Sequence, residues 1–181
     1  MNHMTMLVPY TAGLGAAYTL AGRVAEGIAL LEEALDKAEV HNRANRSLFQ
    51  SWLSQAYLLA AQPEDAIRAA REGLAGARER HERGEEAWNL RDLAEAFAYT
   101  NPQQADVAER YYTESMALAD ELGMRPVLAH CHAGLAKLYR RVDKRTASAE
   151  HFAAATSLYR EMGMTYWLEK AETEMRTLDG S

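Results

Sequence analysis

His130, Cys131 and His132 are the residues whose types could do chemistry at close range, because imidazoles and thiolates bind metals and thiolates attack electrophiles. On a helix each residue turns by about 100°, so His130 and His132 would point about 200° apart. Two helical side chains that share one metal need a spacing of three or four residues. We therefore expect no metal site here, and we interpret Cys131 as a small buried residue rather than a nucleophile.

No other stretch offers workable catalytic geometry. "GLGAAY" at residues 13–18 begins like a phosphate-binding loop, but no strand is expected before it. The sequence contains neither a GxxxxGK[ST] motif nor a GxSxG motif. Glu85 and Glu86 would diverge by about 100° on a helix, so we interpret them as part of a solvated face. The sequence therefore predicts neither an enzyme nor a bound cofactor.

The composition is that of a water-soluble globular chain. It has 181 residues, of which 48% are hydrophobic and 25% charged, with a net charge of -6. This charge disfavours a nucleic-acid binder that works by bulk electrostatics. Cys131 is the only cysteine, so we expect a reducing, cytoplasmic location. Residues before Arg23 carry no Lys, Arg, Asp or Glu, but polar residues interrupt this stretch and no basic segment opens it, so we expect neither a signal peptide nor a membrane span.

Four copies of one helical pattern organise the chain. Each copy reads leucine, a small residue, any two residues and an aromatic residue, with the aromatic residues at positions 18, 57, 97 and 139. A second helical run follows each aromatic residue, with small residues where two antiparallel helices would come closest. One such pair cannot bury its apolar face alone, so the pairs are expected to stack.

The pattern predicts an all-α fold: an α-α superhelix of about four helix pairs with a C-terminal capping helix, in one domain over residues 1–181. We expect Gly123 and Gly163 to end helices in the left-handed conformation, and the four prolines to lie at first helical positions. The predicted repeats and capping helix cover residues 6–42, 44–82, 84–123, 125–163 and 165–178. The prolines are Pro9, Pro63, Pro102 and Pro126.

The leucine, small and aromatic positions resemble those of the tetratricopeptide repeat. The second half is similar to the C-terminal repeat tail of bacterial proteins that carry a class III adenylate/guanylate cyclase domain and an ATPase module. This resemblance is carried by His81–Trp88, Ala117–Arg141 and Leu158–Glu172. It implies a sensing or scaffolding role, as the regulatory tail of a larger signalling protein. It implies no catalysis, because no cyclase or nucleotide-binding sequence is present.

The resemblance also implies a concave groove lined by the first helix of each pair. Mapped onto this sequence, the groove runs from apolar at its N-terminal end to basic at its C-terminal end. We expect it to bind a protein or peptide segment with an apolar part and an acidic part. The alternative is that these charges are ordinary solvated side chains, partly paired with Glu95. The candidate groove residues are Gln55, Trp88, Arg91, Tyr99, His130, Lys137, Arg140 and Arg141. Trp88 and Tyr99 would be aromatic anchors, and the four cations would hold carboxylates.

The uncharged first helix is a poor end cap, because terminal repeats usually carry a polar outer face. We expect it to pack against another copy of the chain, giving a homodimer, or against upstream repeats. Self-association as the main role is therefore the alternative function. An RNA-binding helical repeat is disfavoured by the charge and by the lack of a repeated base-reading pair of positions.

Overall fold

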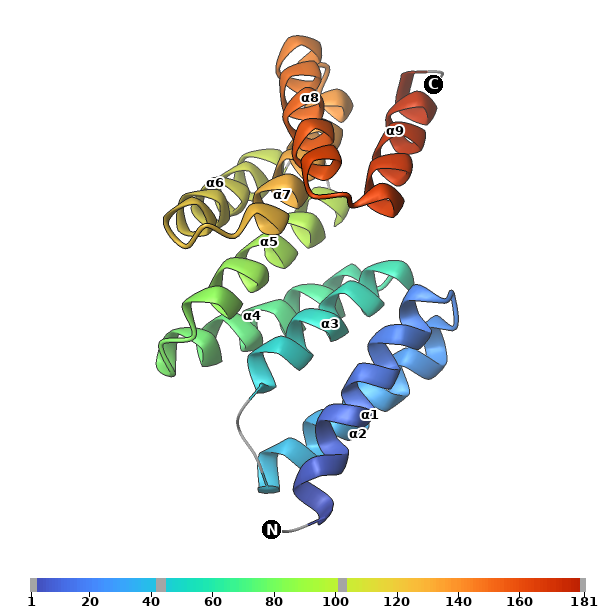
Figure 1. The fold of residues 1–181 in the computed structure, drawn as a ribbon, viewed down its shortest axis with the longest axis vertical. Helices are drawn as coiled ribbons and strands as arrows, with labels where there is room; N and C mark the ends of the chain where they lie inside the picture. Colours follow the sequence, from blue (N-terminus) through green and yellow to red (C-terminus); the bar gives the residue numbers. More distant parts are fainter. Residues whose placement is uncertain (1–2, 42–44, 101–103, 180–181) are drawn as a thin grey trace.

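The computed structural model describes residues 3–41, 45–100 and 104–179, and these residues form nine α-helices and no β-strand (Figure 1). The helices are α1 (His3–Leu20), α2 (Val24–His41), α3 (Arg46–Leu59), α4 (Pro63–Glu79), α5 (Arg83–Thr100), α6 (Ala105–Glu121), α7 (Arg125–Arg141), α8 (Arg145–Glu161) and α9 (Thr165–Asp179). Within the described ranges, no helix combines the length and apolar composition that a membrane crossing requires.

The helices form four antiparallel hairpins, α1/α2, α3/α4, α5/α6 and α7/α8, followed by α9. Each odd-numbered helix also contacts the next odd-numbered helix, from α1 through α9. The odd-numbered helices therefore form a continuous inner layer, and the hairpins turn so that α1 and α9 lie on the same side of α5 (Figure 1). This is the α-α superhelix that the sequence predicts.

The expected turn residues are partly confirmed. Gly123 and Gly163 have φ of 66° and 67°, the left-handed conformation that ends a helix. Pro63 opens α4 and Pro126 is the second residue of α7. The prediction for Pro9 is wrong, because α1 begins at His3 and contains this proline. Burial of the neighbouring Val8 in the core helps to offset the helical hydrogen bond that Pro9 cannot make. Pro102 lies outside the described residues.

Small residues lie where paired helices come closest, as the pattern predicts. A Cβ atom on Gly27 of α2 would lie 2.8 Å from the carbonyl oxygen of Gly15 in α1, so only glycine fits this contact. In each of the later hairpins a buried serine lies at the contact between the two helices and donates a hydrogen bond across it. Ser54 bonds the carbonyl of Ala66, Ser115 that of Ala87 and Ser148 that of Ala136, at 2.7–2.9 Å. Each of these hydroxyls is buried, and the bond to the facing helix gives it a partner within the protein.

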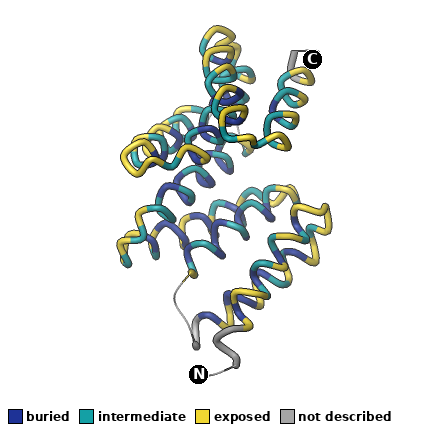
Figure 2. The backbone as a smooth tube through the Cα atoms, viewed as in Figure 1, coloured by how far each residue is buried: buried dark blue, intermediate teal, exposed yellow. Residues whose placement is uncertain are grey.

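Three clusters of buried side chains form the core, and Figure 2 shows the buried residues where the helices face one another. The N-terminal cluster centres on Phe49 and Leu53, the central cluster on Leu93 and Leu135, and the C-terminal cluster on Tyr159. Each cluster joins neighbouring hairpins, so the stack is stabilised by contacts from one repeat to the next.

Candidate binding groove

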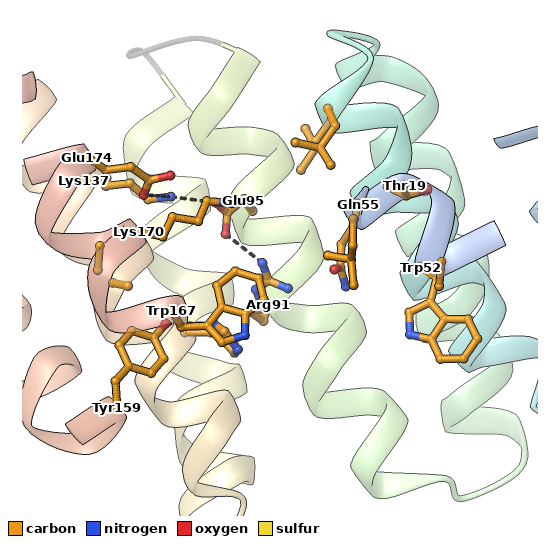
Figure 3. Close-up of a pocket in the computed structure, with 17 residues that line it drawn as sticks. Thr19, Trp52, Gln55, Arg91, Glu95, Lys137, Tyr159, Trp167, Lys170 and Glu174 are labelled. Atoms are coloured by element: carbon orange, nitrogen blue, oxygen red, sulfur yellow. Dashed lines mark hydrogen bonds and ion pairs between the residues drawn. The ribbon is translucent and has the colours of Figure 1, made fainter. Parts of the chain in front are cut away.

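A pocket of about 250 Å³ lies on the inner layer, and all five odd-numbered helices contribute to it (Figure 3). Its N-terminal wall, from α1 and α3, consists of Ala16, Thr19, Leu20, Trp52, Gln55, Leu58 and Leu59. Its floor, from α5, consists of Arg91 and Glu95. Its C-terminal wall consists of His130, Ala133, Lys137, Tyr159, Trp167, Lys170, Ala171 and Glu174. Every residue except Tyr159 comes from an odd-numbered helix.

A chain of alternating charges runs from the floor to the C-terminal wall. The two terminal nitrogens of Arg91 bind Asp92 at 2.8 Å and Glu95 at 3.1 Å. The Nζ of Lys137 lies 3.0 Å from Glu95 and 3.3 Å from Glu174 of α9 (Figure 3). Each cation of this chain therefore has two carboxylate neighbours, and its charge is balanced within the protein.

Burial and pairing act in opposite directions on these carboxyl groups. Burial alone would raise the pKa of Glu95, but Lys137 and Arg91 outweigh it and hold this pKa well below its usual range. At Asp92 burial is stronger than the attraction of Arg91, and the pKa rises to about 6. Asp92 is fully buried and also accepts a hydrogen bond from Ser51. The charges of the floor are thus paired with one another within the protein.

His130 lies at the centre of an aromatic cluster on the C-terminal wall. The centre of its ring is 4.7 Å from that of Trp167, 5.4 Å from that of Tyr159 and 5.7 Å from that of Trp88. The Tyr159 hydroxyl lies 2.8 Å from His130 Nδ1. Burial, with help from the nearby charge of Arg91, lowers the pKa of His130 to about 3, so the ring is neutral at physiological pH.

Lys170 differs from the other cations of the pocket. It makes no ion pair with any described residue, and its ammonium lies 5.2 Å from the ring centre of Trp167. A cation over an indole ring gains a modest attraction without losing its charge. Lys170 is therefore available to a carboxylate that enters the pocket.

The predicted groove residues fall into two groups. Four of them line the pocket: Gln55, Arg91, His130 and Lys137. Four do not: Trp88, Tyr99, Arg140 and Arg141. Trp88 packs behind His130, Tyr99 is exposed, and Arg141 donates a hydrogen bond to the carbonyl of Ala98.

The three residues at 130–132 face three different surroundings. His130 faces the pocket, and His132 faces His151, with 2.9 Å between the two Nδ1 atoms. Cys131 is fully buried, and burial raises the pKa of its thiol to about 12, which makes it unreactive. Within the described ranges no cluster of three His, Cys, Asp or Glu side chains is arranged to hold a metal ion.

Sequence reasoning missed the contribution of α9. Trp167, Lys170 and Glu174 follow one another by three and four residues, so they share one face of the helix, and this face points into the pocket (Figure 3). The sequence contains this spacing but not the curvature of the superhelix, which brings α9 opposite α3. Trp52 of α3, which the candidate groove residues do not include, also lines the pocket.

The fold and the inner pocket define this chain as a tetratricopeptide-like α-α superhelix. A scan of protein-family models gave no match, and a search of curated proteins gave no similar sequence. Among solved structures, aspartyl phosphate phosphatase F from Bacillus subtilis superposes on 96% of this chain with a TM-score of 0.77 and 14% identity. This chain covers 45% of the phosphatase chain.

The TPR-like repeats of a putative kinesin light chain from Podosopora anserina superpose on 99% of this chain, with a TM-score of 0.66 and 18% identity, and the match covers 97% of that chain. A single-substitution variant of the same repeats gives a TM-score of 0.65, at 18% identity, over 98% of this chain and 96% of that one. At these identities the likeness establishes the fold alone.

Proposed function

We propose that this chain is a non-catalytic binding module that holds a short protein or peptide segment in the pocket. The observation that carries the proposal is the convergence of all five odd-numbered helices on one pocket with an apolar wall opposite an aromatic wall. Concave sites with apolar walls and a few polar groups are typical ligand sites. A helical ligand would be about 10–12 Å wide with its side chains, and a pocket of about 250 Å³ has no room for it. The pocket suits a few side chains of an extended segment instead.

The walls define the chemistry of that segment. Trp52, Leu58 and Leu59 favour an apolar side chain, because burying apolar surface against them removes it from water. Arg91 and Lys137 already have carboxylate partners, so an acidic group of the ligand is assigned instead to Lys170. The ligand is thus an apolar segment with one carboxylate, and Lys170 replaces the four cations named from the sequence.

The likeness of Ala117–Arg141 and Leu158–Glu172 to the repeat tails of cyclase-containing proteins supports a regulatory role for this binding. In that role, occupancy of the pocket would be the signal that a larger signalling protein senses. The pocket combines residues from both of these segments, including Lys137 and Trp167.

The test begins with selection of peptides from a display library on the immobilised wild-type protein. Selected peptides are then titrated against Ala133→Phe, which fills the pocket, and Ala153→Phe, which adds the same ring to an exposed position of α8. We expect the pocket variant to lose at least about tenfold in affinity, and the control to bind as wild type does. Equal binding to both variants, or selection of no peptide, contradicts the proposal.

A second arm tests the carboxylate. Lys170→Glu should weaken a selected acidic peptide by about tenfold or more, Lys170→Arg should retain most of the affinity, and changing the peptide's Asp to Asn should remove the difference. If Lys170→Glu has no effect while Ala133→Phe abolishes binding, the pocket is the site but Lys170 does not hold the carboxylate.

A further inference from the structure

The first helix exposes a position that the later repeats bury. Leu14 of α1 is 45% exposed, whereas the leucines at the same position of the repeat pattern are 6%, 0% and 2% exposed. These leucines are Leu53, Leu93 and Leu135. The same residue type at the same repeat position therefore belongs to the core in three copies and lies open in the first.

A second position shows the same contrast. Tyr10 is 70% exposed, and its repeat equivalents, four residues before each leucine, are 2%, 0% and 0% exposed. These equivalents are Phe49, Asn89 and Cys131. With Leu7, which is also exposed, Tyr10 and Leu14 lie along one face of α1 at a helical spacing of three and four residues. We name Leu7, Tyr10 and Leu14 the α1 stripe.

In the later repeats the preceding even-numbered helix covers these positions. Phe49 of α3 belongs to the same core cluster as Leu31 and Leu35 of α2. Asn89 of α5 lies so close to Gly73 of α4 that a Cβ on this glycine would collide with the asparagine side chain. The thiol of Cys131 in α7 lies 3.3 Å from the hydroxyl of Ser115 in α6. Among the residues that the structure describes, no helix packs on the α1 stripe as α2 packs on α3.

We propose that α1 of a second copy of this chain supplies such a helix, in a two-fold symmetric dimer. Helix α1 contains no Asp, Glu, Lys or Arg, so two α1 helices meet without burying an unpaired charge. The opposite end of the stack is a poor partner, because α9 presents the exposed Glu169 and Arg176. A two-fold axis uses the same patch on both copies and closes the assembly, whereas a head-to-tail contact would continue into a fibre.

The α1 stripe and the pocket use different faces of one helix. Ala16, Thr19 and Leu20 of α1 line the pocket, and the stripe residues do not. The dimer therefore leaves the pocket of each copy open while its interface supports the N-terminal wall from behind. Self-association and ligand binding are compatible on this chain.

The mass of the protein in solution tests the dimer. Light scattering of the wild-type chain at micromolar concentration should give twice the chain mass of 20.2 kDa. Tyr10→Glu should raise the dissociation constant by at least about tenfold with an unchanged helical circular dichroism spectrum, because Tyr10 is exposed in the single copy. Tyr99→Glu changes another exposed tyrosine, on α5, and should leave the dimer intact.

Cross-linking tests the geometry. Leu7→Cys, Tyr10→Cys and Leu14→Cys are oxidised one at a time, and the native Cys131 is buried and does not interfere. At least one stripe position should form a disulfide between copies, since facing Cα atoms within about 7 Å can be bridged. A wild-type monomer, a dimer unaffected by Tyr10→Glu, species that grow beyond the dimer, or no disulfide at any stripe position would each overturn the proposal.

Discussion

The two walls of the pocket are built by opposite means. The N-terminal wall carries no charged residue, and the α1/α2 hairpin behind it is joined by the close contact of Gly15 and Gly27. The C-terminal wall carries Lys137, Lys170 and Glu174, and it is tied to the floor by ion pairs. One wall depends on the fit of backbones and the other on the balance of charges.

This difference means that the two walls should respond to different changes. Adding one carbon atom where two backbones touch lowers the stability of the fold, because packed interiors contain little spare space. A change of charge or of pH is felt where a buried ion loses its partner, because the remaining charge is then poorly solvated. The N-terminal wall should therefore be sensitive to size and insensitive to pH, and the C-terminal wall the reverse.

Glu95→Gln should produce the largest effect, because Glu95 is the carboxylate that Arg91 and Lys137 share. Removing its charge leaves two cations close together in a site that is mostly shielded from water. We expect the free energy of unfolding, measured by urea denaturation at pH 7, to fall by about 3 kcal/mol.

Glu174→Gln is the matched control for this change. Glu174 binds the same Lys137 but is more exposed at the end of the charge chain, so its loss should cost less than about 1 kcal/mol. If the two variants are equally stable, sharing Glu95 between two cations adds no stability. The proposal that the C-terminal wall depends on balanced charges is then wrong.

Gly27→Ala should have the next largest effect, and it acts on the other wall. The new Cβ would lie 2.8 Å from the carbonyl oxygen of Gly15 and 3.0 Å from the backbone nitrogen of Thr19. Backbone atoms cannot rotate away, so α1 and α2 must separate. Overpacking of this kind should lower the free energy of unfolding by about 2 kcal/mol.

Gly13→Ala provides the control in the same hairpin, because a Cβ at Gly13 meets no atom within 4 Å. Here alanine should stabilise α1 by about 0.5–1 kcal/mol, the usual gain over glycine in a helix interior. A similar loss at both positions would show that glycine matters here for the helix itself and not for the contact between helices.

The features that sequence could predict are those that repeat. Leu53, Leu93 and Leu135 mark the buried face of three helices, and the small residues that follow them mark the helix contacts, so the fold follows from spacing. Gly123 and Gly163 end helices in the left-handed conformation, which glycine adopts with less strain than Ala61 and His81, which take it at two other helix ends. These signals are local, or recur at a fixed distance along the chain.

The pocket depends instead on the angle between hairpins, which accumulates over the stack. Trp52 and Trp167 line opposite walls although 115 positions separate them along the chain. No spacing along the sequence predicts that these two tryptophans line the same pocket. Arg140 and Arg141 do not line the pocket although they lie on the same helix as Lys137, so an offset along the sequence does not by itself identify the residues of the pocket.

Acidification should produce the smallest effect, and it should act through His130 on the C-terminal wall. Burial lowers the pKa of this folded imidazole from 6.5 to about 3, so the unfolded chain takes up the proton first as the pH falls. The contribution of His130 to stability is therefore complete above pH 6.5 and is lost progressively toward pH 3. Between pH 7 and pH 5 the loss from His130 alone should be about 2 kcal/mol, and the opposing effect of Asp92 should reduce the net loss to less than about 1 kcal/mol.

The comparison with His130→Gln isolates this contribution, because the opposing effect of Asp92 is common to both proteins. The pKa of Asp92 is raised from 3.8 to about 6, so this carboxyl group favours the folded state as the pH falls through 6. Urea denaturation at pH 7 and pH 5 should show that wild type loses more stability than His130→Gln. Leu59→Ala, on the N-terminal wall, should lose as much as wild type; if it matches His130→Gln instead, the pH sensitivity does not belong to the C-terminal wall.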